Sequence, residues 1–122
     1  MGTPYRFELA VHETYLHATV WGEHTPENAS RFLREVYEAC LANRKDSVLL
    51  DMRLDGPTMG TSSIFSVVQE RSGDGRGLRR IAYVDGARDP EKAKFAETVA
   101  RNRGVNVRLF ATVEEAKEWL GD

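Results

Sequence analysis

The chain has 122 residues, of which 41% are hydrophobic and 30% charged, and its 17 basic and 19 acidic side chains leave a formal net charge of −2. This composition excludes collagen-like, low-complexity and broadly disordered proteins, and the small net charge argues against a nucleic-acid or membrane-surface partner. The single cysteine, Cys40, cannot form an internal disulfide, and no zinc-type cysteine and histidine spacing occurs. We expect one cytoplasmic domain over residues 1–122, with no cofactor, metal or membrane span.

The chain opens with two stretches, residues 5–11 and 15–21, in which hydrophobic and polar residues alternate. Alternation with period two is typical of half-buried strands, and two such stretches close together predict a hairpin. A tight turn at residues 13–14 places His12 opposite Tyr15. Because these turn residues are not a typical two-residue turn sequence, a bulge or a longer loop is the alternative.

Three helices are marked by their N-terminal residues. Each start has a hydroxyl or carboxylate at the N-cap, followed by a proline or a capping-box glutamate: Thr25 with Pro26, Asp89 with Pro90, and Thr112 with Glu115. Hydrophobic residues at helical spacing follow each cap. The first two helices are expected to end near Asn43 and near Gly104, where a left-handed cap is expected.

A fourth helix is predicted between the first two of these, from the hydrophobic residues 64–68 that follow the turn-rich residues 54–63. The glycine-rich residues 72–77 are expected to form a flexible loop. Short apolar runs over residues 46–52, 80–84 and 105–110 read as strands.

The order of elements is therefore β-β-α-β-α-β-α-β-α, which predicts an α/β fold with a mainly parallel five-stranded sheet. The first strand is antiparallel and lies at the edge. If the strands follow sequence order, right-handed crossovers place the helices on one face and leave the other uncovered; the alternative is that helices cover both faces.

This order of elements resembles the STAS-like (SpoIIAA-like) fold of anti-sigma-factor antagonists, and is most similar to a little-characterised bacterial branch of short stand-alone proteins. The resemblance extends from Phe7 to Leu120. Its most specific stretches are residues 80–85 (RIAYVD), residues 100–107 (ARNRGVNV) and the closing residues 110–120, which end in EEAKEWL. It implies a non-catalytic regulatory or protein-interaction module.

In the antagonists, a serine in an Asp-Ser-Ser-Gly type motif before the second helix is phosphorylated by a partner kinase. The matching place here is residues 60–63 (GTSS), so the resemblance implies a phospho-acceptor at Ser62, flanked by Thr61 and Ser63. Gly60 replaces the family aspartate, Ser63 replaces the glycine, and the loop is one residue longer. From the residues alone, these hydroxyls are expected to cap the helix, and its free amides suit an anion.

The hairpin supplies a second candidate site on its polar side, formed by five side chains: Arg6, His12, Tyr15, His17 and Trp21. Large amphipathic side chains on an uncovered sheet face are typical of an interface, here with a protein partner or a second copy of the chain. The alternative is that they pack in the core or on one another. His24 completes no metal site with His12 and His17, because the pairing supplies no third ligand.

Two functions remain from these patterns. The first is an interaction module that uses the hairpin or the loop over residues 54–63. The second is a carrier or sensor of a small apolar or anionic ligand, held between the sheet and the second helix beside Phe65 and Val68. An enzyme would require a cleft that joins a histidine, a carboxylate and a serine, and is not expected.

Overall fold

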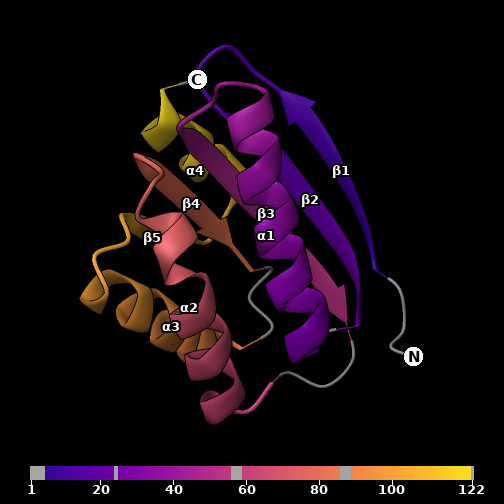
Figure 1. The fold of residues 1–122 in the computed structure, drawn as a ribbon, viewed down its shortest axis with the longest axis vertical. Coiled ribbons are helices and arrows are strands. Elements are labelled where there is room, and N and C mark those ends of the chain that lie inside the picture. The colour runs from indigo at the N-terminus through magenta and orange to yellow at the C-terminus, as the bar shows by residue number, and fades with distance from the viewer. Residues whose placement is uncertain (1–4, 24, 56–58, 86–88, 122) are drawn as a thin grey trace.

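The computed structural model describes residues 5–23, 25–55, 59–85 and 89–121. It contains five strands and four helices in the predicted order (Figure 1). In chain order they are β1 (Arg6–Val11), β2 (Leu16–Glu23), α1 (Pro26–Ala42), β3 (Ser47–Asp55), α2 (Thr61–Gly75), β4 (Arg80–Val84), α3 (Pro90–Asn102), β5 (Val107–Phe110) and α4 (Val113–Leu120). No helix in the described part of the chain is long and apolar enough to cross a membrane.

The five strands form one sheet in sequence order, β1-β2-β3-β4-β5. Strand β1 pairs antiparallel with β2, and all other pairs are parallel. The hairpin turns tightly: the backbone N–H of His12 donates to the carbonyl of Tyr15 at 2.9 Å, and Val11 pairs with Leu16. The predicted fold class and hairpin register are therefore confirmed, without the bulge that was the alternative.

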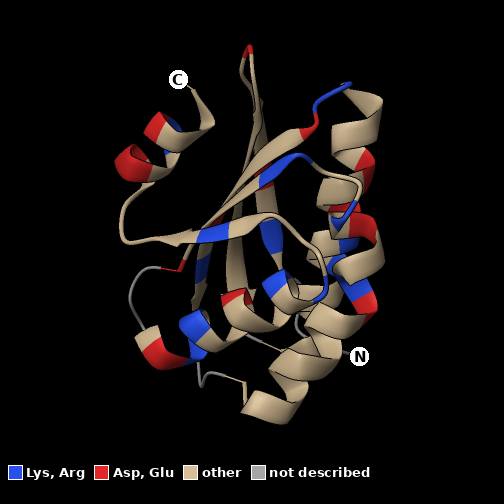
Figure 2. Ribbon diagram, turned by 90° about the vertical axis from the view of Figure 1, so that its left-hand side faces the viewer, with Lys and Arg blue, Asp and Glu red and all other residues tan. Residues whose placement is uncertain are grey.

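The helices form two unequal layers. Helices α1, α2 and α3 connect parallel strands by crossovers and lie on one face, whereas α4 packs on β3, β4 and β5 from the other face (Figure 2). Because α4 does not connect two of the five strands, the crossover rule does not determine its side. The expectation that one face stays wholly uncovered is wrong: α4 covers part of it, and the hairpin end stays open.

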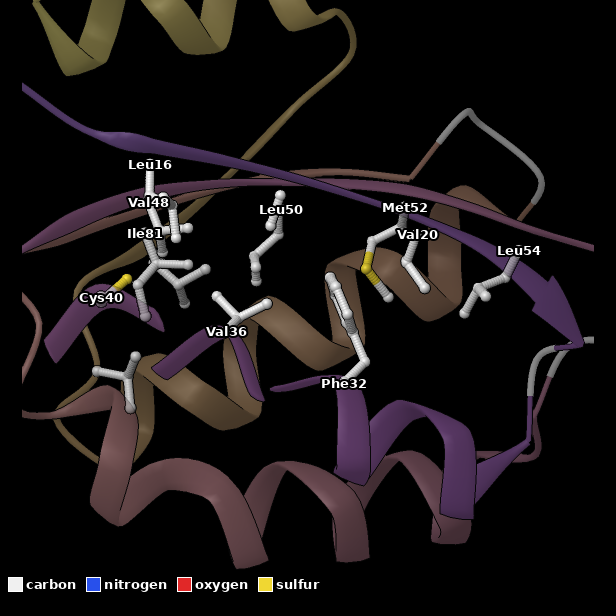
Figure 3. Packing of buried hydrophobic residues seen from close by; sticks show 13 residues of the cluster. Leu16, Val20, Phe32, Val36, Cys40, Val48, Leu50, Met52, Leu54 and Ile81 are labelled. Carbon is white, nitrogen blue, oxygen red and sulfur yellow. The ribbon is translucent and has the colours of Figure 1, made fainter. Parts of the chain in front are cut away.

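The larger core lies between the sheet and α1 (Figure 3). Alternate residues of β2 and β3, such as Leu16, Val20 and Leu50, point toward Phe32 and Val36 of α1. The full set of buried residues in this cluster also contains Ala18, Cys40, Val48, Met52, Leu54, Ile81, Val105 and Val107.

A second core lies beneath α4, on the opposite face of the sheet. Ala116 and Leu120 of α4 pack there with Leu49, Ala82 and Val84. Tyr15 belongs to the same cluster and is 0% exposed.

Several boundaries differ from the sequence prediction. Strand β5 begins at Val107 rather than at residue 105, and α2 begins at Thr61, before the apolar residues 64–68. Strand β3 continues to Asp55, beyond the predicted end at residue 52. Helix α2 continues to Gly75, so residues 72–75 are helical rather than part of a flexible loop. The glycine fits because α2 packs tightly here: a Cβ on Gly75 would lie 3.1 Å from Cγ1 of Val105.

The helix caps agree with the prediction at three of the four starts. The side chains of Thr25, Asp89 and Thr112 accept hydrogen bonds from backbone amides one turn later. Gly104 adopts the left-handed conformation expected after α3, with a φ of 85°.

Candidate functional site

A cavity of about 160 Å³ lies between the sheet and the layer of three helices. Helices α1 and α3 flank it, and α2 packs against both of them across the gap. Its walls are mostly apolar: the sheet contributes Val48, Leu50, Met52, Ile81 and Val107, α1 contributes Ala29, Leu33 and Val36, α2 contributes Ile64, Val67 and Val68, and α3 contributes Ala93, Ala96 and Ala100.

The cavity follows from the small side chains of α3. The face that this helix turns to the cavity carries Ala93, Ala96 and Ala100, which reach less far than the leucines and valines of the other walls. Larger side chains at these three positions would fill the space, so the small residues of α3 leave packing contacts unmade there.

Polar groups line part of the same cavity. The Tyr83 hydroxyl donates a hydrogen bond to Oδ2 of Asp85 at 3.2 Å. Burial, together with the negative charge and hydrogen bond of Asp85, raises the pKa of Tyr83. Lys92 and Asp89 also contribute to the lining, with Nζ and Oδ2 3.9 Å apart. The cavity therefore combines an apolar body with a protonated phenol and a carboxylate.

A second hollow, a polar groove, runs between α1 and α2. Its lining carries three arginines and two glutamates, together with two serines: Arg31, Arg34, Arg71, Glu27, Glu70, Ser30 and Ser66. Arg71 is already paired, through Nη2 with Glu70 at 2.8 Å and through Nη1 with Asp74 at 3.2 Å. Because the charges oppose one another within the chain, the groove does not resemble a site built for an anion.

The predicted phospho-acceptor lies in the first turn of α2. The N-cap is Gly60, and no side chain caps this helix. Thr61 and Ser62 are exposed and Ser63 is half-buried. The expectation that these hydroxyls cap the helix is therefore wrong, because they already stand inside it. Phosphorylation of Ser62 stays a prediction.

The five residues of the predicted hairpin surface do not share one environment. Tyr15 is fully buried beneath α4, which corrects its expected place on an exposed face. His12 stacks on the Tyr15 ring at a centroid distance of 4.6 Å. Trp21 is half-buried, and the guanidinium of Arg6 lies 4.4 Å from its ring centroid.

His17 joins a buried carboxylate that the sequence analysis missed. Its Nε2 lies 3.1 Å from Oδ2 of Asp51, whose side chain is 4% exposed. Arg53 donates to the same carboxylate through Nε at 3.2 Å and Nη2 at 3.1 Å. The signal in the sequence was a lone acidic residue inside the apolar run VLLDM.

The structure also places the remaining residues that the sequence analysis considered. Val68 lines the cavity as expected, whereas Phe65 is 40% exposed and lies under the guanidinium of Arg103. Cys40 is buried, and burial raises the pKa of its thiol to about 11. His24 lies outside the described residues, among which no group of three ligands could hold a metal ion.

The structure is similar to that of an uncharacterized protein from Shewanella loihica PV-4, a member of the DUF3478 family with a SpoIIAA-like fold. The similarity covers 98% of each chain, with a TM-score of 0.60 and 16% sequence identity. No protein-family model matches the chain, and neither does any curated protein. The structural likeness confirms the predicted STAS-like, SpoIIAA-like fold.

Proposed function

We propose, with the SpoIIAA-like fold as the premise, that this chain is a non-catalytic binding module that holds a small apolar molecule between its sheet and helices α1, α2 and α3. The observation that carries this proposal is the apolar cavity of about 160 Å³. A mostly apolar pocket with a few polar groups at its wall is the usual form of a small-molecule site.

The distribution of reactive groups supports a non-catalytic function. His17 and Asp51 pair on the face of the sheet that α4 partly covers. The hydroxyls of residues 61–63 lie in α2, on the opposite side of the sheet. Because a hydrolytic site needs its base and its nucleophile within hydrogen-bond reach, these groups do not form one.

The size and lining of the cavity indicate the class of ligand. An apolar cavity of roughly 150 Å³ accommodates benzene, so this cavity suits a molecule of about that size. Four carboxylates line the cavity, against two cations, so the lining disfavours a further anion: Asp74, Asp85, Asp89 and Glu97, with Arg71 and Lys92. We therefore expect an apolar ligand that carries at most a hydrogen-bond donor, such as a hydroxyl group, rather than a carboxylate.

Thermal unfolding of the full chain with benzene, phenol or benzoate tests the proposal. Benzene and phenol are expected to raise the melting temperature, because a ligand that binds only the folded state stabilises it. Benzoate is expected to have no effect. Native mass spectrometry of the chain purified from cells is expected to reveal a bound small molecule.

The variant Ala96→Leu fills the cavity from α3 and is expected to abolish stabilisation by benzene. Ala42→Leu, on the exposed end of α1, makes the same substitution outside the cavity and is expected to respond as the wild type does. If Ala96→Leu folds poorly, Ala93→Val provides a smaller change in the same wall. A wild-type chain that responds to neither benzene nor phenol, or a filled variant that still responds, would contradict the proposal.

A second candidate function is a protein-interaction module that uses the open hairpin surface. It is favoured by one observation: Trp21 and its neighbours Arg6 and His17 lie beyond the strands that α4 covers. A partner or second copy held there should be released by Trp21→Ala. Light scattering that shows the same molar mass with and without this substitution would remove the hairpin surface as an interface.

A further inference from the structure

The two edges of the sheet differ in how their backbone groups are satisfied. At the β5 edge, the carboxylate of Glu97 accepts a hydrogen bond from the backbone N–H of Leu109 at 2.7 Å. The guanidinium of Arg101 donates to the carbonyl of Val107 at 3.1 Å. Two side chains of α3 therefore take up outward-facing hydrogen-bonding groups of the β5 backbone, which hinders another strand from pairing with this edge.

The β1 edge has no such cover among the described residues. Because the His12 N–H bonds to Tyr15, the alternation of an antiparallel ladder directs the backbone of the even-numbered residues toward β2. The backbone groups of Phe7, Leu9 and Val11 therefore point outward. Strand β1 contains no proline and no bulge, and its two charged residues, Arg6 and Glu8, have opposite signs.

The same outward-bonding residues carry apolar side chains. Leu9 is 40% exposed and Val11 is 55% exposed, and both lie on the side of the sheet that faces α1. Unpaired backbone groups and exposed hydrophobic side chains on one edge strand are the features that strand addition uses.

We propose that β1 pairs antiparallel with β1 of a second copy of this chain, which joins the two sheets into one. The proposal commits to a register in which Phe7 lies on the two-fold axis. Arg6 of each copy then faces Glu8 of the other, and Leu9 faces Tyr5. Within one chain Nη2 of Arg6 lies 3.9 Å from Oε1 of Glu8, and the guanidinium also lies over the Trp21 ring. Both side chains are exposed, so this pair can be exchanged for the two pairs between copies.

Charge complementarity is the reason to assign this edge to a second copy. The sequence Arg6-Phe7-Glu8 reads as opposite charges around a central residue, which is self-complementary when two strands run antiparallel. A register centred on Glu8 would place two carboxylates directly opposite each other, which is unfavourable. The pairing does not depend on the cavity, so it stands or fails independently of the proposed function.

Sedimentation velocity of the full chain over a range of micromolar concentrations tests the pairing. We expect a concentration-dependent dimer, and we expect Leu9→Lys to make the chain monomeric. Glu8→Arg should raise the dissociation constant on the order of tenfold, because two opposite-charge pairs become like-charge pairs. The swapped variant Arg6→Glu/Glu8→Arg should restore an affinity close to that of the wild type.

Two further measurements keep this test specific. Arg108→Glu places the same kind of charge change on the covered β5 edge and should leave the dimer unchanged. Hydrogen exchange at the amides of Phe7 and Leu9 should slow as the concentration rises. A wild-type chain that stays monomeric, a dimer indifferent to Glu8→Arg, or a swapped variant that fails to recover would overturn the proposal.

Discussion

Asp51 is the most constrained charged residue on the open face of the sheet. Its side chain is 4% exposed, yet His17 and Arg53 satisfy its oxygens with hydrogen bonds of 3.1 to 3.2 Å. The guanidinium of Arg53 also lies 6.0 Å from the ring centroid of Trp21. This one carboxylate therefore fixes the side chains that surround Trp21 on the hairpin surface.

Replacing Asp51 with alanine is expected to lower the free energy of unfolding by about 2 kcal/mol, because a charge-assisted network loses its acceptor. Asp55→Ala is the matched control, since Asp55 is exposed on the same face of the same strand. It should change stability by less than about 0.5 kcal/mol. Urea unfolding followed by circular dichroism measures both values, and equal losses would contradict this role of Asp51.

At the residue scale, the sequence predicts local chemistry well and burial poorly. Thr25, Asp89 and Thr112 cap their helices as expected, because a cap needs only residues within one turn. The burial of Tyr15 and Asp51 depends on α4 and on neighbouring strands, which are distant along the chain. Alternation along β2 places Tyr15 on the correct face but does not say that α4 covers it.

At the scale of elements, α3 has two functions in the structure. It lines the cavity with alanines, and it covers the β5 edge with Glu97 and Arg101. Although burial alone would raise it, the pKa of Glu97 is held below its usual value by hydrogen bonds from Lys94 and from the Leu109 amide, and by the positive charges of Lys94 and Arg101. The folded state therefore favours the ionised carboxylate.

This lowered pKa predicts how Glu97→Gln changes stability with pH. A carboxylate whose pKa is lower in the folded than in the unfolded chain stabilises the fold at pH values above its ordinary pKa of 4.5. This contribution is lost as the pH falls through the pKa of the folded state. The variant should be about 1 kcal/mol less stable at neutral pH and should approach the wild type below pH 4.5. Urea unfolding at several pH values measures the stability of both chains, and Glu38→Gln, at an exposed position of α1, is the control. A stability difference between Glu97→Gln and the wild type that stays constant with pH would contradict the prediction.

The length of α2 shows why element boundaries are harder to predict than element order. Residues 72–77 are rich in glycine, which favours a loop when only local preference is considered. In the structure, a Cβ on Gly75 would lie 3.1 Å from Cγ1 of Val105, so the glycine allows close contact between α2 and the residues just before β5. That contact is tertiary and leaves no local signal in the sequence.

At the scale of the whole molecule, the sheet could be predicted because single helices between strands allow few arrangements. The cavity could not be predicted in the same way. It depends on α2 lying across α1 and α3, and on the alanines of α3 facing the floor of the sheet. The sequence suggested a ligand between the sheet and the second helix, but it assigned the exposed Phe65 to the lining.

The methyl NMR spectrum of the chain, recorded with and without dissolved xenon, tests the central claim most directly. Xenon enters apolar cavities without requiring a hydrogen-bond partner. The account predicts xenon-induced shifts for the methyl groups of Ile64, Val67 and Ile81, which line the cavity. It predicts none for the methyl groups of Ala116 and Leu120, which α4 contributes to the second core. Unchanged resonances at the cavity, or equal shifts in both cores, would contradict a ligand cavity between the sheet and its three helices.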